Sequence, residues 1–246
     1  MLAIAGAVKE EIANTRKRMN VRTTLEEAGC CLFEGSYGSK DVILVQTGIG
    51  GERARAAAQL LGEKYSLSAL ISIGFGGALG EDLQVGDIVL CRQTRCGENE
   101  NGRRTYYSDD DLLMLSKDIA REAAGRVRVG GGVTVNRVLT SPDEKRAVGR
   151  EYGADVVDME SYWLAEAAAL RGVPFLGVRV VSDTATERLP DLGQLVDADG
   201  AFLWQKAAGY LPTHLPEIGG LSVMHRNVVA ARRQLGVFVD RLIGRL

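Results

Sequence analysis

Three groups of acidic residues stand where they could act together on a bound ligand. Each group directly follows a short apolar run: Glu10 and Glu11 follow Leu2–Ala5, Asp158-Met159-Glu160 follows Asp155–Val157, and Ser182-Asp183 follows Phe175–Val181. In parallel α/β sheets the carboxyl ends of the strands share one edge, and ligands bind in the crevice there. Carboxyl groups gathered at such an edge can supply a general acid, a general base and hydrogen-bond acceptors. We therefore expect these acids to converge on one site.

Each acid taken singly also has a structural explanation. Glu10 and Glu11 would favour the dipole of a helix that starts beside them, and this is the better interpretation of Glu10. Asp158 suits the cap of a helix beginning near Ser161. Asp183 could close a turn through its side chain. The common position of the three groups after strands favours function over these local roles.

Two glycine clusters lie at other strand ends. Thr47-Gly48-Ile49-Gly50-Gly51 leads straight into a helix, and Gly74-Phe75-Gly76-Gly77 follows the run Ala69–Ile73. Glycine lets the backbone approach a ligand closely, and a helix N-terminus presents N–H groups to an anion. Gly48, Gly50 and Arg53 are therefore candidates for anion binding. Neither cluster matches the glycine patterns of dinucleotide-binding folds or P-loops, which disfavours a nicotinamide-dependent oxidoreductase.

These residues need a scaffold, and the alternation of short apolar runs with helical segments predicts an α/β domain with a mostly parallel, twisted, mixed sheet flanked by helices. The expected strands are Leu2–Ala5, Val42–Gln46, Ala69–Ile73, Asp87–Cys91, Val127–Val133, Asp155–Val157 and Phe175–Val181, with Cys30–Ser36 as a further candidate. The expected helices are Glu10–Arg18, Glu52–Lys64, Asp110–Ala124, Pro142–Tyr152, Ser161–Arg171 and about 222–244. The polar segment Cys96–Ser108 is expected to be a long loop.

The last helix carries one apolar stripe and one basic face. The stripe consists of Leu221, Met224, Val228, Ala231, Leu235, Phe238 and Leu242, and the opposite face carries Arg226, Arg232, Arg233 and Arg241. This pattern predicts a helix that covers the core and leaves its arginines in solvent. The alternative is a surface for a membrane or a lipid-like substrate.

Composition excludes several other classes of protein. The 246 residues suit one domain covering 1–246, and 30 basic against 32 acidic residues give no reason to expect nucleic acid as a partner. Four cysteines without a CxxC pair and two histidines, His214 and His225, argue against a metal site. No apolar run approaches the roughly 20 residues of a membrane span, and the N-terminus is unlike a signal peptide. We expect a cytoplasmic protein that does not associate with membranes.

Six blocks of sequence resemble the superfamily of purine nucleoside phosphorylases and methylthioadenosine/S-adenosylhomocysteine nucleosidases. The blocks are G-A-V-K-E-E at Gly6–Glu11, T-G-I-G at Thr47–Gly50, the glycine-rich run at Gly74–Asp87, D-M-E-S at Asp158–Ser161, and V-P-F with V-R-x-x-S-D between Val173 and Asp183. They occur in the family's order between Leu2 and Ala185. The resemblance implies cleavage of the N-glycosidic bond of a purine nucleoside, without a cofactor and in a homo-oligomer.

The resemblance also assigns roles to single residues. Glu11 falls where the nucleosidases carry the acid that activates water, Glu160 where the family binds the ribose hydroxyls, and Asp183 where purine-cleaving members address N7 of the base. Asp183, if burial keeps it protonated, would make the departing base neutral, and Glu160 would stabilise the cation-like sugar. The other expected substrate contacts are Met159, Ser182, Val138, Gly76 and Phe75, with backbone near Arg137 and Val138 beside the base.

The resemblance leaves the attacking nucleophile open. Where hexameric phosphorylases hold phosphate with an arginine and a serine, this chain has Ser72 and Phe75, which favours water. Arg53 and Arg55 remain alternative phosphate ligands. The nucleosidases also tend to have serine at the position of Phe75, so the phenylalanine by itself does not distinguish hydrolysis from phosphorolysis.

The substrate is open as well. The D-M-E-S-Y and S-D-T-A runs with Leu189-Pro190 resemble the hopanoid-associated phosphorylases, which implies adenosylhopane with phosphate as co-substrate. The expected activity is hydrolysis of an adenosine-type nucleoside such as methylthioadenosine or S-adenosylhomocysteine. Phosphorolysis, and a nucleoside sensor without turnover, are the alternatives.

Overall fold

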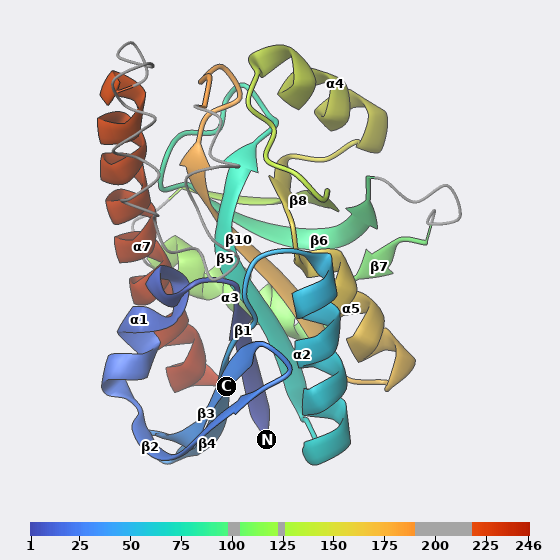
Figure 1. Cartoon of the computed structure of the whole chain (residues 1–246), viewed down its shortest axis with the longest axis vertical. Helices are drawn as coiled ribbons and strands as arrows, with labels where there is room; N and C mark the ends of the chain where they lie inside the picture. The colour runs from blue at the N-terminus through green and yellow to red at the C-terminus, as the bar shows by residue number, and fades with distance from the viewer. Residues whose placement is uncertain (98–103, 123–125, 190–217) are drawn as a thin grey trace.

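A twisted mixed sheet runs through the middle of the molecule, with helices on both faces (Figure 1). The computed structural model describes residues 1–97, 104–122, 126–189 and 218–246, and for 218–221 it describes the backbone alone. The strands are β1 Leu2–Gly6, β2 Asn20–Glu27, β3 Cys30–Tyr37, β4 Lys40–Gln46, β5 Ala69–Ala78, β6 Ile88–Cys96, β7 Tyr106–Tyr107, β8 Val127–Thr134, β9 Val156–Asp158 and β10 Phe175–Asp183. The helices are α1 Lys9–Arg18, α2 Gly51–Lys64, α3 Asp110–Glu122, α4 Pro142–Tyr152, α5 Ser161–Leu170 and α7 Ile218–Arg245.

The sheet folds back on itself around β5. This strand pairs with β1 along its first half and with β10 along most of its length, and its last residues pair antiparallel with β9. Strands β10, β6, β8 and β9 are paired in that order, so the five strands β5, β10, β6, β8 and β9 form a closed ring. The ring places the ends of β5, β9 and β10 beside one another.

Side chains of successive residues in the central strands point to opposite faces of the sheet, so the core has two layers. In β1, Leu2 and Ile4 pack with α1, α3 and α7, whereas Ala3 and Ala5 pack with α2 and α5. Strands buried on both faces need apolar residues at every position, as β1 has. The two helical layers therefore hold the carboxyl ends of the strands in fixed positions.

Helix α7 is the largest single cover on its face of the sheet. Ala231, Leu235, Phe238 and Leu242 of the expected stripe are buried in the first layer. Arg226, Arg233 and Arg241 are exposed on the opposite side. The prediction of a core-covering helix is therefore confirmed for its described side chains.

Most sequence-based elements are confirmed, with four differences. Strand β2 was not predicted, because six of its eight residues are exposed and it carries no alternating apolar pattern. The glycine run Gly74–Gly77 lies inside β5 rather than after it, and the short β7 interrupts the expected loop Cys96–Ser108. Half of the strand pairings between described residues are antiparallel, a larger share than we expected. Pro190 and His214 lie outside the described residues.

Candidate active site

Glu11 lies in the first turn of α1 and turns its carboxylate back toward the sheet. Its Oε2 accepts hydrogen bonds from the N–H groups of Ala7 at 2.6 Å and Val8 at 3.1 Å, and its Oε1 accepts one from Phe75 N at 2.8 Å. Each carboxylate oxygen has two lone pairs, so Oε1 keeps an acceptor position for a further partner. Burial raises the pKa of Glu11, and Arg179 and the three N–H groups oppose that rise. A carboxylate with a raised pKa suits a general base.

The glycine of β5 beside Glu11 makes room for this arrangement. A Cβ atom at Gly74 would lie 2.7 Å from Glu11 Oε1, closer than such contacts occur in proteins. Only glycine at this position lets the strand and the carboxylate approach so closely. The close approach of Glu11 therefore explains the glycine at position 74.

Glu160 precedes α5, and its carboxylate reaches the start of α2. Gly50 N donates a hydrogen bond to Glu160 Oε1 at 2.7 Å. Burial raises the pKa of Glu160 to about 8, with further contributions from the charges of Asp158 and Glu11. Glu11 and Glu160 thus share one electrostatic environment. A ligand that donates hydroxyl hydrogen bonds to this pair would favour its ionised form.

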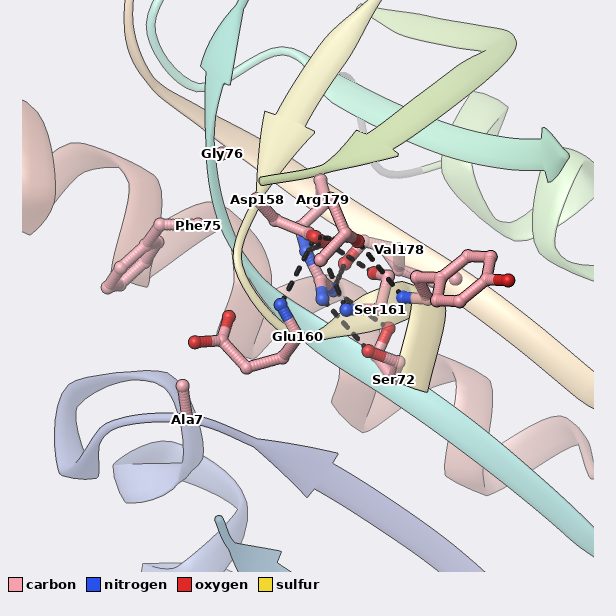
Figure 2. A network of polar contacts seen from close by, with 12 residues as sticks. Ala7, Ser72, Phe75, Gly76, Asp158, Glu160, Ser161, Val178 and Arg179 are labelled. Carbon is pink, nitrogen blue, oxygen red and sulfur yellow. Dashed lines mark hydrogen bonds and ion pairs between the residues drawn. The ribbon is translucent and has the colours of Figure 1, made fainter. Parts of the chain in front are cut away.

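Asp158 organises the turn that carries Glu160. Its Oδ1 accepts hydrogen bonds from Thr134 Oγ1 at 2.5 Å, Ser161 N at 3.2 Å and Glu160 N at 3.3 Å. The expectation that Asp158 caps the following helix is confirmed. Figure 2 shows the Glu160 side chain leaving this network and pointing toward the side of Ala7 and Phe75.

Arg179 anchors the same network from the middle of β10. Its Nε donates to Asp158 Oδ2 at 2.7 Å, and its Nη1 and Nη2 donate to Ser72 O at 3.1 Å and Ser72 Oγ at 2.9 Å (Figure 2). Only 2% of Arg179 is exposed. A buried guanidinium needs such partners, and the charges of Asp158 and Glu11 raise its pKa against the opposing effect of burial.

Asp183 ends β10 and is paired with a buried lysine of α4. Lys145 Nζ donates to Asp183 Oδ2 at 2.5 Å, while Ser182 Oγ donates to Asp183 Oδ1 at 2.7 Å. Both oxygens of the carboxylate therefore accept hydrogen bonds within the protein. Lys145 was not predicted from the sequence as a partner of Asp183.

The backbone of β5 connects the acids. Phe75 N binds Glu11, and a Cβ atom at Gly77 would lie 3.0 Å from Asp183 Oδ2. The stretch from Gly74 to Gly77 spans about 10 Å in extended conformation. Glu11 and Asp183 therefore flank one short stretch of strand, and Glu160 is coupled to Glu11. The three acids therefore lie near this stretch of β5, and their action on one ligand stays a prediction.

The other expected substrate contacts surround this stretch. Phe75 and Gly76 belong to β5, and Gly76 O lies 3.3 Å from Ser182 Oγ, whose one hydrogen also serves the shorter contact with Asp183 Oδ1. Met159 is half-buried in the turn between Asp158 and Glu160. Val138 is 42% exposed in the segment between β8 and α4. Their contact with a substrate stays a prediction.

The expected anion site at the start of α2 contacts a carboxyl group of the protein itself. Gly48 and Gly50 have positive φ angles of 78° and 97°, which favour glycine. The N–H of Gly50 binds the carboxylate of Glu160, and Arg53 Nη1 donates to Gly29 O at 2.9 Å. Binding of an external anion by these residues stays a prediction.

Sequence reasoning missed Lys145 and Arg179, although both left a signal. Arg179 is the one charge inside the apolar run of β10 before its terminal Asp183. Lys145 shares a face of α4 with Val148 and Tyr152, which pack against the core beside that helix. A charged residue at a core position requires a buried partner. That requirement points to a network without identifying its members.

The described part of the chain contains neither a candidate metal site nor a candidate membrane-spanning helix. It contains no cluster of three or more histidine, cysteine, aspartate or glutamate side chains suited to a metal ion. Within the same residues, no helix is both long enough and apolar enough to cross a membrane.

A mixed sheet with a closed ring of strands and helices on both faces defines the class of this protein as α/β. The sequence profile of the phosphorylase superfamily matches residues 1–203. The chain belongs to this superfamily.

Relatives are similar along most of the chain. The 5′-methylthioadenosine/S-adenosylhomocysteine nucleosidases of Aeromonas salmonicida and Oceanobacillus iheyensis are each 29% identical over 75% of this chain and 86% of their own length. The fold of the nucleosidase from Neisseria meningitidis, solved in complex with methylthio-immucillin-A, has a TM-score of 0.80 at 22% identity over 100% of this chain and 99% of its own. Futalosine hydrolase of Helicobacter pylori has a TM-score of 0.80 at 18% identity, covering 100% and 97%.

Proposed function

We propose that this protein hydrolyses the N-glycosidic bond of an adenosine-type nucleoside and releases adenine. The observation that carries the proposal is the placement of Glu11 and Asp183 at the two ends of the Gly74–Gly77 stretch, with Glu160 coupled to Glu11. Breaking a ribosyl C–N bond leaves positive charge on the sugar and negative charge on the base. Acids on both sides of the bond can stabilise the positive charge on the sugar and neutralise the negative charge on the base. The names of the nucleosidase relatives support the same substrate class.

Each acid takes one part of the reaction. Glu11 accepts a proton from water through the remaining acceptor position of Oε1, while the water oxygen bonds to C1′ of the sugar. Glu160 accepts hydrogen bonds from the ribose hydroxyls and stabilises the cation-like sugar. The C1′–N9 electron pair moves to the base, and Asp183 delivers a proton to N7. Such acid assistance contributes about 10²- to 10⁴-fold to a rate.

The partners of nearby cations support water rather than phosphate as the nucleophile. Arg179 is paired with Asp158 and with Ser72, and Arg53 donates to the carbonyl of Gly29. Phosphate bound beside Glu11 and Glu160 would also oppose the ionisation of both acids. Water brings no charge to the same position. No cofactor is needed for this reaction.

Adenine release from methylthioadenosine, S-adenosylhomocysteine, adenosine and futalosine, measured with and without phosphate, tests the proposal. Hydrolysis predicts free sugar, no phosphate requirement, and ¹⁸O at C1′ when the reaction runs in H₂¹⁸O. Sugar 1-phosphate as product would replace hydrolysis by phosphorolysis. Binding of these nucleosides without adenine release would identify a sensor.

Replacing Asp183 with asparagine should remove turnover while the fold remains intact. An amide has nearly the shape of the carboxyl group but cannot deliver the proton, so we expect a loss of about 10²- to 10⁴-fold in kcat. Steady-state assays on methylthioadenosine measure this, with circular dichroism as the control for folding. A rate near that of the unmodified protein would remove Asp183 from the mechanism.

A further inference from the structure

Lys145 is fully buried although it carries a charge, and its ammonium group is saturated by the protein. Nζ donates to Asp183 Oδ2 at 2.5 Å, to Thr184 O at 2.8 Å and to Glu187 O at 3.1 Å. A lysine ammonium has three N–H donors, and all three are used. This geometry requires the protonated amine, because a neutral amine has only two hydrogens for three acceptors.

The hydrogen bonds around Asp183 likewise favour its ionised form. Lys145 donates to one carboxylate oxygen, and Ser182 Oγ donates to the other at 2.7 Å. The other carboxylate near the amine, that of Glu187, instead accepts from Asn227 of α7 and from Thr184 N. Among the described residues, Asp183 is thus the one acid with which Lys145 forms an ion pair.

An ionised Asp183 is the wrong form for binding a purine nucleoside. N7 of adenosine presents a lone pair, and a carboxylate facing it has no proton to donate. The two groups repel unless one proton is taken up on binding. On the proposed function, the enzyme must therefore acquire this proton before the glycosidic bond breaks.

We propose that Lys145 is a positioning residue that holds Asp183 as a carboxylate in the free protein, so that the substrate binds together with one proton. When the nucleoside binds, the carboxylate of Asp183 takes up one proton, and the resulting carboxyl O–H donates a hydrogen bond to N7. As the C1′–N9 bond breaks, this proton passes to N7 and Asp183 returns to the carboxylate beside Lys145. The inference rests on the proposed function and adds that Lys145 sets the protonation state of Asp183 before the substrate binds.

Proton uptake by the unmodified protein gives a direct test. Carbocyclic adenosine has an N7 lone pair and cannot be cleaved, whereas 9-deazaadenosine carries N7–H; both have the same diol facing Glu160. Calorimetric titration at neutral pH in buffers of different ionisation enthalpy measures the protons taken up. We expect carbocyclic adenosine to take up about one proton more than 9-deazaadenosine. Equal uptake would overturn the proposal.

The variant Lys145→Met tests the lysine itself. Loss of the cation leaves a buried carboxyl group without its counter-charge, so Asp183 stays protonated to higher pH. The alkaline limb of the kcat/KM profile should move up by about one to three pH units. Proton uptake on binding carbocyclic adenosine should shrink toward zero. A purely structural role would lower the rate at every pH and leave the profile in place.

Two further variants control this experiment. Lys145→Arg keeps the charge and should keep the profile of the unmodified protein. Arg146→Met removes a cation from the same helix that pairs with exposed Asp143 at the surface, and it should change neither profile nor uptake. If Lys145→Met fails to fold, the two-ligand titration of the unmodified protein still decides. Absence of both nucleoside binding and adenine release would instead overturn the proposed function.

Discussion

At the scale of single residues, burial with a single hydrogen-bond donor distinguishes Glu160 from the other buried acids of the site. Glu160 is 9% exposed and accepts one hydrogen bond within the described network, from Gly50. Asp158 is also buried but has Arg179 and several hydrogen-bond donors. The structure therefore neutralises Asp158 fully and leaves Glu160 in need of a donor. A ribose diol is such a donor.

Glu160→Gln should change how stability depends on pH. The folded-state pKa of Glu160 is raised to about 8 from 4.5, so its stabilising contribution is complete below about pH 4.5 and is lost as pH rises through 8. The free energy of unfolding of the unmodified protein should therefore fall relative to that of the variant over this range, by at most about 1.4 kcal/mol per pH unit. Urea unfolding at several pH values measures this difference.

The control for this variant is Glu63→Gln on α2, which also removes one carboxylate but at an exposed position. A difference between unmodified protein and Glu160→Gln that stays constant from pH 5 to 8 would contradict the raised pKa. Glu160→Gln should also lose adenine release, because its amide NH₂ group cannot accept hydrogen bonds from the ribose hydroxyls.

At the scale of elements, β5 acts as the common support of the site. It touches Glu11 through Phe75 N, Ser182 through Gly76 O, and Asp183 at Gly77. At Gly74 and Gly77 the absence of a side chain lets Glu11 and Asp183 lie close to the strand. Glycine lowers the strand propensity of β5, but it lets Glu11 and Asp183 approach the backbone of the strand.

Gly74→Ala should reduce activity much more than stability. The added Cβ atom would meet the end of the flexible Glu11 side chain at 2.7 Å, so Glu11 would move and lose its place beside Phe75. A misplacement of about 1 Å at a catalytic group can cost roughly 10²-fold in rate. Adenine release and thermal unfolding, measured in parallel, separate the two effects.

Gly244→Ala provides the matched comparison for this substitution. Apart from its chain neighbours and the backbone of its own helix, no atom lies within 4 Å of the Cβ position at Gly244, and the residue lies in α7, where alanine is favoured. It should leave the rate unchanged. Equal rates in Gly74→Ala and the unmodified protein would show that Glu11 needs no exact position.

At the scale of the whole molecule, the two helical layers unite chain segments that are far apart in sequence. The layer beneath α7 contains side chains from α1, α3 and α7 as well as from β1, β4, β5 and β10. Such a shared core predicts that residues 1–246 unfold as one domain. Assembly into a homo-oligomer stays a prediction.

Phe238→Ala tests this shared core. Phe238 is fully buried in α7, so its truncation should cost about 3–5 kcal/mol of unfolding free energy. Helix content and nucleosidase activity should be lost in one transition, because α7 and the strands of the site share one core. Val237→Ala, at a more exposed neighbouring position, is the control. Activity lost well before the helices melt would argue for separate units.

The sequence by itself determined most of the element types, and it led to the prediction that Glu11, Glu160 and Asp183 share one site. These follow from local periodicity, from glycine chemistry and from the rule that parallel strands end at one edge. The amphipathic α7 was predicted for the same reason. Strand β2, mostly exposed, carries no such signal.

Only the tertiary structure decided which charges meet. Lys145 and Asp183 are 38 residues apart, Gly50 and Glu160 are 110 apart, and Arg179 and Ser72 are 107 apart. The closed ring of strands brings these partners together, and burial then sets the pKa of Glu160. Protonation depends on desolvation and on neighbouring charges, which are properties of the folded chain and have no local pattern in the sequence.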